Sequence, residues 1–145
     1  AKKSAKRLLR QRMHDSIIRH TIRHSGGVTI KSEHEIQNEI LLALSKNGAT
    51  VCRSNAGKIK TKDGRTIVLF PKGWPDITGT IHKTGQILLI EVKTKTGKLR
   101  PEQKRFAEFI KKYVPNAAYG VARSVEDALD IVDRGIEHDR KMERH

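Results

Sequence analysis

The sequence has one cysteine, Cys52, and no apolar run near the roughly 20 residues that a membrane-spanning helix needs. A single thiol cannot form an internal disulfide, which suits a reducing compartment. The longest apolar runs, Ile40 to Leu44 and Ile87 to Ile90, have the length of buried core segments. The start of the chain also lacks the apolar stretch of a signal peptide. We therefore expect no membrane-spanning segment and a cytoplasmic location.

Acidic residues are scarce beside basic ones. The 16 Asp and Glu stand against 30 Lys and Arg, which gives a net charge of +14. Such a charge causes self-repulsion in the folded state and is best explained as complementing a polyanion. Nucleic acid is the first expectation, and an anionic membrane surface or a basic structural role in a ribosome are the alternatives. The length of 145 residues is that of one domain, which needs no disulfide or structural metal to fold.

Acids are rarest in residues 1–31, which we interpret as a basic N-terminal arm. Its basic side chains are Lys2, Lys3, Lys6, Arg7, Arg10, Arg12, Arg19, Arg23 and Lys31. Leu9, Met13 and Ile17 follow one another at steps of four, a spacing that allows a helix. The arm either docks on the domain or on a second subunit, or it is a solvated extension.

Two neighbouring apolar runs carry charged residues at one end each. Pro75-Asp76 precedes a predicted strand that ends near Ile81, and Glu91-Val92-Lys93 ends the next strand. The turn at Lys83-Thr84-Gly85 makes the two strands antiparallel, so Asp76 and Glu91 should meet at one edge of the sheet. Glu91 and Lys93 share one side of their strand because side chains alternate. This arrangement would let the carboxylates hold a cation while the lysine reaches a water.

A third acid is predicted to face the same region from a helix over residues 33–46. Ser32 and Glu35 form a capping box at its start. At 100° per residue Glu33 falls on the apolar face of this helix, whereas Glu35 and Glu39 point away. Glu33 should therefore direct a carboxylate toward the body of the domain. The alternative is that Glu33 only complements the helix dipole in the first turn.

A hairpin is predicted around Asp63-Gly64, with strands at 58–60 and 66–70. Its basic side chains would suit a phosphate backbone, although an ordinary solvated hairpin has the same pattern. The candidate nucleic-acid contacts are Arg53, Lys58, Lys60, Lys72, Lys95 and Lys98.

The C-terminal half alternates helix, strand and helix. Pro101 begins a predicted helix that ends near Tyr113, and within it Gln103 can either turn inward toward the acids or remain exposed. A final strand is predicted at 117–122 and a final helix from Ser124 to Gly135. Residues 136–145 are predicted to be a solvated tail.

The predicted elements form a mixed β-sheet flanked by helices, in the order αβββαβ. The acids Glu33, Asp76 and Glu91 supply oxygen ligands without thiolate or imidazole, which favours Mg²⁺ or Mn²⁺ over zinc. Such a cation suits the hydrolysis of phosphodiesters. Lys93 would either deprotonate the attacking water or orient it, and the residues leave both roles open.

Taken together, Glu33, Gln37, Gly73 to Asp76, Glu91-Val92-Lys93 and Leu99 to Gln103 resemble the PD-(D/E)xK nuclease superfamily. More narrowly they resemble its VRR-NUC branch of phage and repair nucleases, over residues 32–134. The resemblance implies a restriction-endonuclease-like core at 32–135. It implies Glu33, Asp76, Glu91 and the Val92 carbonyl as metal ligands, Lys93 as the catalytic lysine and Gln103 as an active-site helper.

Stand-alone members of this branch are similar to structure-specific endonucleases and are often dimeric. The resemblance therefore implies a DNA endonuclease for branched substrates or nicking, dependent on Mg²⁺ or Mn²⁺, in a phage or bacterial setting. Two alternatives stay open. One is a basic nucleic-acid-binding module without turnover, and the other is a restriction-type enzyme that reads sequence.

Overall fold

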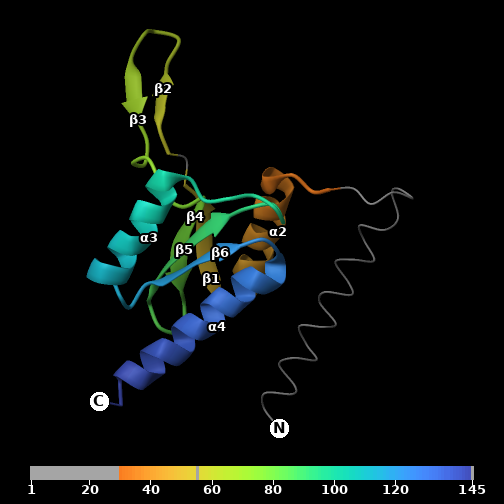
Figure 1. The fold of residues 1–145 in the computed structure, drawn as a ribbon, viewed down its shortest axis with the longest axis vertical. Coiled ribbons are helices and arrows are strands. Elements are labelled where there is room, and N and C mark those ends of the chain that lie inside the picture. The colour runs from red at the N-terminus through yellow and green to blue at the C-terminus, as the bar shows by residue number, and fades with distance from the viewer. Residues whose placement is uncertain (1–29, 55, 145) are drawn as a thin grey trace. The chain divides into compact units, whose positions relative to one another are not determined.

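Strand β5 (Ile87–Val92) is one of two interior strands of the main sheet and has a neighbour on each side. The structure is a computed structural model that describes residues 30–54 and 56–144 (Figure 1). Its main sheet has the order β1 (Ala49–Arg53), β4 (Ile77–Ile81), β5 and β6 (Ala118–Ala122). The pairs β1–β4 and β4–β5 are antiparallel and β5–β6 is parallel. The predicted mixed sheet with flanking helices is confirmed.

The hairpin of β4 and β5 has the predicted direction. Ile77 pairs with Ile90, so Asp76 at the entrance of β4 lies beside Glu91 at the exit of β5. Gly85 makes the reversal at the other end with a φ of +72°, a conformation that glycine adopts without strain. The antiparallel hairpin therefore places the two acids at one edge of the sheet.

The two faces of the sheet are covered by different helices. Leu88, Ile90 and Val92 point into the core that β5 shares with α2 (Glu33–Lys46) and α4 (Val125–Met142). Glu91 points to the opposite face, where it contacts Gln103 of α3 (Pro101–Tyr113). Because α3 connects the parallel strands β5 and β6, it crosses over that face (Figure 1). The acid of β5 thus lies under α3, away from the main core.

The start of α2 has the predicted cap. The Ser32 hydroxyl accepts a hydrogen bond from the Glu35 amide at 3.3 Å, and the Glu35 carboxylate accepts one from the Ser32 amide at 2.8 Å. This capping box satisfies two amides that a helix start leaves without partners. It also sets the position of Glu33, the first residue of the helix.

The predicted basic hairpin forms a separate two-stranded sheet of β2 (Lys58–Lys60) and β3 (Thr66–Val68). All six residues of the two strands are exposed, and the ribbon extends away from the main sheet (Figure 1). Strand β3 ends at Val68 rather than at the predicted residue 70. Gly64 takes a φ of +84° in the turn that the Asp63-Gly64 pair predicted.

The last helix corrects one prediction, because α4 continues past Gly135 to Met142. Gly135 is a close-packing position and not a helix end. A Cβ placed on it would lie 2.7 Å from the Cβ of Ala118 on β6. Ile136 then packs against the core, which extends the buried face of the helix into the segment predicted to be a tail.

Residues 31–145 form one compact unit. The predicted basic arm, with its possible helix, lies almost wholly outside the described residues. Within residues 30–54 and 56–144, no helix is both long and apolar enough to cross a bilayer.

The contact between β4 and β1 generates a prediction for Gly79→Ala. A Cβ at Gly79 would lie 2.1 Å from the Thr50 carbonyl oxygen and 2.9 Å from the Val51 Cα, so the backbone of β1 would have to move. We expect this overpacking to lower the free energy of unfolding by about 2–3 kcal/mol, measured by urea denaturation.

Gly85→Ala is the matched control. Nothing lies within 4 Å of a Cβ at this position, so the cost is only the left-handed backbone of a turn residue, about 1 kcal/mol. A loss in Gly79→Ala no larger than that in Gly85→Ala would contradict the close approach of the two strands.

Candidate active site

The end of β5 places a carboxylate and an ammonium on the face under α3. The Lys93 Nζ donates hydrogen bonds to the Glu91 Oε1 at 2.7 Å and to the Val92 carbonyl oxygen at 3.1 Å. The two charged residues are 1% and 7% exposed, respectively. Burial of a charge is costly unless it is paired, and this contact supplies the pairing.

Asp76 joins this group from the start of β4. Its Oδ2 accepts a hydrogen bond from the Val92 amide at 2.7 Å, so its carboxylate is tied to the backbone between Glu91 and Lys93. This hydrogen bond lies next to the last backbone pair of β4 and β5, Ile77 with Ile90, and a side chain replaces the backbone as the acceptor. The acid pair expected at the matched strand ends is therefore present.

The environment of Glu91 raises the pKa of its carboxyl group. Burial is the main cause, and together with the negative charge of Asp76 it raises the pKa of Glu91 from 4.5 to about 7, against the opposing effect of the Lys93 hydrogen bond and charge. Desolvation and a like charge both disfavour the ionised carboxyl group. A further cation beside these two acids would stabilise their charged forms.

Glu33 reaches the site from the first turn of α2. Its Oε1 lies 3.7 Å from the Lys93 Nζ, so the ammonium lies between Glu33 and Glu91. The loop after β5 is close by, because a Cβ at Gly97 would lie 3.3 Å from the same Glu33 oxygen. Glu33 thus meets the lysine of the site, as predicted, while its side chain stays 42% exposed.

Gln103 turns inward and joins α3 to the acid of β5. It is 3% exposed, its Nε2 donates to Glu91, and its Oε1 accepts from the Arg100 amide at 2.8 Å. One side chain therefore caps the start of α3 and holds the Glu91 carboxylate. Of the two placements that the sequence allowed for Gln103, the structure has the inward one.

The donors at this site have the chemistry that a hard divalent cation requires. Asp76 and Glu91 contribute carboxylate oxygens, and the Val92 carbonyl oxygen is within contact of Lys93. In the part of the chain that the structure describes, no three His, Cys, Asp or Glu side chains converge closely enough to hold a metal ion. The third predicted acid, Glu33, contacts the Lys93 ammonium instead. The residues present therefore fit an oxygen-bound cation through two acids and a carbonyl.

The predicted nucleic-acid contacts do not form a single cluster. Arg53 is half-buried, and its guanidinium contacts His34 at 3.3 Å and also Asn38, so it serves to join β1 to α2. The other five are exposed: Lys58 and Lys60 on the hairpin, Lys72 before β4, and Lys95 and Lys98 in the loop between β5 and α3.

Sequence patterns did not indicate the aromatic residues beside the acids. The Phe106 ring lies 5.1 Å from the Trp74 ring and 6.4 Å from the Tyr119 ring, measured between centroids. Burial and, to a smaller extent, the charge of Glu91 raise the pKa of Tyr119. These residues come from three separate segments, namely the segment before β4, α3 and β6, which the parallel pairing of β5 with β6 and the crossing of α3 bring together. Helical spacing places Phe106 on the apolar face of α3, but it does not indicate which rings that face meets.

A model of the VRR-NUC domain family matches residues 9–126. The match begins inside the basic arm, which the residue-level resemblance had kept outside the family's core. A solved structure described as a VRR_NUC domain is 27% identical, with 73% of this chain and 95% of that chain covered and a TM-score of 0.48. No functionally curated protein matches the chain.

The pKa of Glu91 predicts how stability depends on pH without divalent metal. Between pH 4.5 and about 7 the folded chain keeps a proton on Glu91 that the unfolded chain has released. The free energy of unfolding should therefore fall as the pH rises through this window, by on the order of 3 kcal/mol from this group. Glu91→Gln removes the titration, so its stability relative to the wild type should increase between pH 4.5 and 8 in urea denaturation with EDTA.

Glu35→Gln is the control, and its stability curve should run parallel to that of the wild type above pH 4.5. Hydrogen bonds from Ser32 lower the pKa of Glu35, so its contribution is present above the unfolded pKa and is lost as the pH falls. Parallel curves for the wild type and Glu91→Gln from pH 4.5 to 8 would contradict the environment that the structure gives Glu91.

Proposed function

Because the chain belongs to the VRR-NUC domain family, which is a nuclease-type family, we propose that it is a Mg²⁺- or Mn²⁺-dependent endodeoxyribonuclease. One observation carries the proposal. Asp76 and Glu91 come together at the paired ends of β4 and β5, with the Lys93 ammonium 2.7 Å from Glu91. These two acids and the lysine are largely shielded from solvent, and the chain around them is strongly basic. Such a group can bind a divalent cation and hydrolyse a phosphodiester.

Asp76, Glu91 and the Val92 carbonyl oxygen would hold the cation, with Glu33 available from the start of α2. When bound, the cation supplies positive charge against the scissile phosphate and the leaving oxygen. The chain itself keeps the acids in place. The Val92 amide fixes Asp76 at 2.7 Å, and Gln103 fixes Glu91. These ligands are therefore organised before substrate binds.

Lys93 would orient the attacking water. A lysine ammonium has three N–H donors, and two of them are used by the Glu91 carboxylate and the Val92 carbonyl. The Glu33 carboxylate at 3.7 Å lies beyond direct hydrogen-bond distance, which leaves one donor for a water or a phosphate oxygen. The two hydrogen bonds hold the ammonium in one position, which suits the role of an orienting donor.

Branched DNA is the proposed substrate, and a homodimer is the proposed assembly. The net charge of +14 and the exposed basic hairpin support DNA binding through phosphates. The hairpin extends away from the main sheet, so it can contact a duplex arm beyond the one at the acids (Figure 1). A pure binding module is disfavoured because buried acids repel phosphates unless a cation is present.

The first test is cleavage of labelled linear duplex, single strand, flap and four-way junction with Mg²⁺, Mn²⁺ or EDTA. We expect the wild type to cut a branched substrate only with metal. Asp76→Asn and Lys93→Met should each lower the cleavage rate by roughly 10²–10⁴-fold, while DNA binding by Lys93→Met persists.

Glu39→Gln is the matched control, because Glu39 is an acid of α2 paired on the surface with Lys31 at 2.7 Å. It should cleave like the wild type. Undiminished cleavage by Asp76→Asn would refute the assigned site. Tight binding of the junction without cleavage of any substrate would favour the non-catalytic module.

Metal binding has a second readout that does not depend on activity. Saturating Mg²⁺, at about ten times its dissociation constant, should stabilise the wild type by about 1.4 kcal/mol, a rise in Tm of a few degrees at pH 8. Asp76→Asn and Glu91→Gln should each lose most of this rise in thermal denaturation. Equal rises in all three proteins would place the cation elsewhere.

The hairpin predicts the salt dependence of DNA binding. If Lys58 and Lys60 each neutralise one phosphate, changing both to Gln should lower the slope of log Kd against log salt concentration by about two. Lys46→Gln, at the end of α2, is the control and should leave the slope unchanged. Binding titrations from low to physiological salt measure both slopes, and an unchanged slope in the hairpin variant would remove the hairpin from the interface.

A further inference from the structure

All six aromatic residues of the sequence form one connected row of rings. The row runs from Phe70 through Trp74 to Phe106 and then along α3, and Tyr119 joins it at Phe106. Its successive centroid distances are 4.9 Å for Phe70–Trp74, 5.1 Å for Trp74–Phe106, 6.4 Å for Phe106–Phe109 and 5.1 Å for Phe109–Tyr113. We call this the aromatic row.

The inner and outer parts of the aromatic row differ in exposure. Trp74, Phe106 and Tyr119 are half-buried, and packing of α3 on the sheet explains them. Phe70, Phe109 and Tyr113 are 40%, 50% and 61% exposed. Aromatic residues are only 4% of this sequence, so the two neighbouring exposed rings of Phe109 and Tyr113 are a concentrated apolar surface that α3 does not need for its own packing. Phe70 adds a third exposed ring at the other end of the row.

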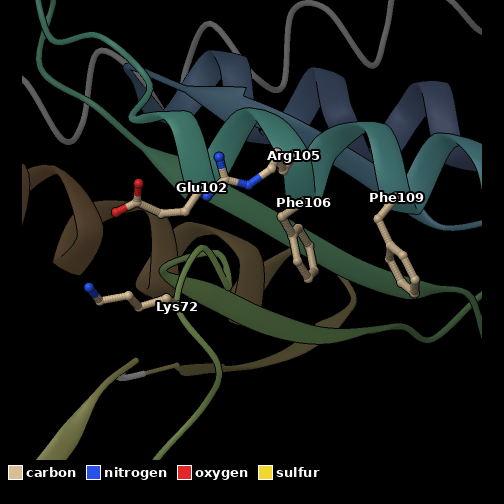
Figure 2. Close-up of a pocket in the computed structure, with 5 residues that line it drawn as sticks. All are labelled: Lys72, Glu102, Arg105, Phe106 and Phe109. Atoms are coloured by element: carbon tan, nitrogen blue, oxygen red, sulfur yellow. The ribbon is translucent and has the colours of Figure 1, made fainter.

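Positive charge accompanies the exposed rings. Lys72 and Arg105 line a hollow of about 380 Å³ together with Glu102, Phe106 and Phe109. Figure 2 shows the two phenylalanine rings projecting from the same side of α3 into this region. The Glu102 carboxylate has a cation of its own, since its Oε1 lies 3.7 Å from the Arg100 Nε.

The same combination continues at the far end of α3. The Lys112 ammonium lies 5.0 Å from the centre of the Tyr113 ring. Lys72, Arg105 and Lys112 are all exposed. Phe109 thus shares the hollow with two cations, and Tyr113 has a third beside it.

We propose that the aromatic row and its cations bind the unpaired nucleotides of a DNA strand that leads into the active site. This inference rests on the proposed nuclease function and adds the strand geometry of its substrate. Bases of an unpaired strand can stack on Phe109 and Tyr113, while Lys72 and Arg105 neutralise the adjacent phosphates. Bases inside a duplex have no free face for such stacking, so this surface distinguishes a single-stranded tail from a fully paired arm.

The charge distribution favours nucleic acid over a second copy of the chain at this surface. A twofold contact through the aromatic row would bring the surface that carries Lys72, Arg105 and Lys112 onto the same surface of the other copy. Like charges brought together at an interface oppose association. A polyanionic strand meets the same cations with attraction.

The test compares two DNA ligands and four variants. Fluorescence anisotropy in EDTA measures the binding of a duplex with a single-stranded tail and of a fully paired duplex of equal total length. Phe109→Ala should weaken binding of the tailed duplex about tenfold and change binding of the paired duplex by less than about twofold. Phe109→Trp should keep the tailed affinity, because it retains a stacking ring.

Leu42→Ala is the matched control, since Leu42 is 57% exposed on α2 and lies outside the aromatic row. It should leave both affinities unchanged. Tyr113→Ala, at the most exposed ring, repeats the test and decides it if circular dichroism shows that Phe109→Ala is misfolded. Equal losses on both ligands, or no loss on the tailed duplex, would overturn the proposal.

Two further outcomes separate this inference from its premise. If the wild type cleaves DNA but the aromatic variants show no tail-specific loss, the strand-binding surface is wrong and the nuclease function stands. If no DNA is cleaved while the tail-specific loss is found, the nuclease function fails and the surface stands.

The oligomeric state gives a separate test. If the wild type sediments as a dimer that Phe109→Ala dissociates, the row is a subunit contact and the proposal is refuted.

Discussion

The hydrogen bond from the Val92 amide to the Asp76 carboxylate, at 2.7 Å, is the constraint on which the site depends. It extends the antiparallel ladder of β4 and β5 by one side chain and keeps the entrance of one strand level with the exit of the other. A slip of one residue would turn Glu91 to the face of the core. The apolar residues on that face, Leu88 and Ile90, therefore protect the register that the site requires.

The site is kept at a cost to the fold. A buried carboxyl group whose pKa is raised to about 7 makes the folded chain less stable at neutral pH than an amide in its place would. Lys93 and Gln103 offset part of that cost by contacting Glu91 directly. Acids held in this way are already positioned to bind a cation. Because burying Glu91 lowers the stability of the fold, its retention indicates a functional role.

Helix α3 combines the separate tasks of the molecule. Its first turn holds Glu91 through Gln103, its middle packs Phe106 against Trp74, and its last turns present Phe109 and Tyr113 to solvent. A strand bound along the exposed rings would be directed toward the acids by the same helix that positions them. The basic hairpin of β2 and β3 is a second exposed surface, which we propose contacts phosphates.

The sequence by itself determined the elements and much of the acid site, because these depend on local rules. The cap at Ser32, the turn at Gly85 and the alternation along β5 follow from neighbouring residues, and they predicted which charged side chains would meet. Tertiary structure decided what depends on contacts between distant segments. It set the close packing that lets α4 pass Gly135, and it chose the inward turn of Gln103 from the two placements that helical spacing left open. It also decided which rings the apolar face of α3 would meet, because Trp74 and Tyr119 lie far from that helix in the sequence.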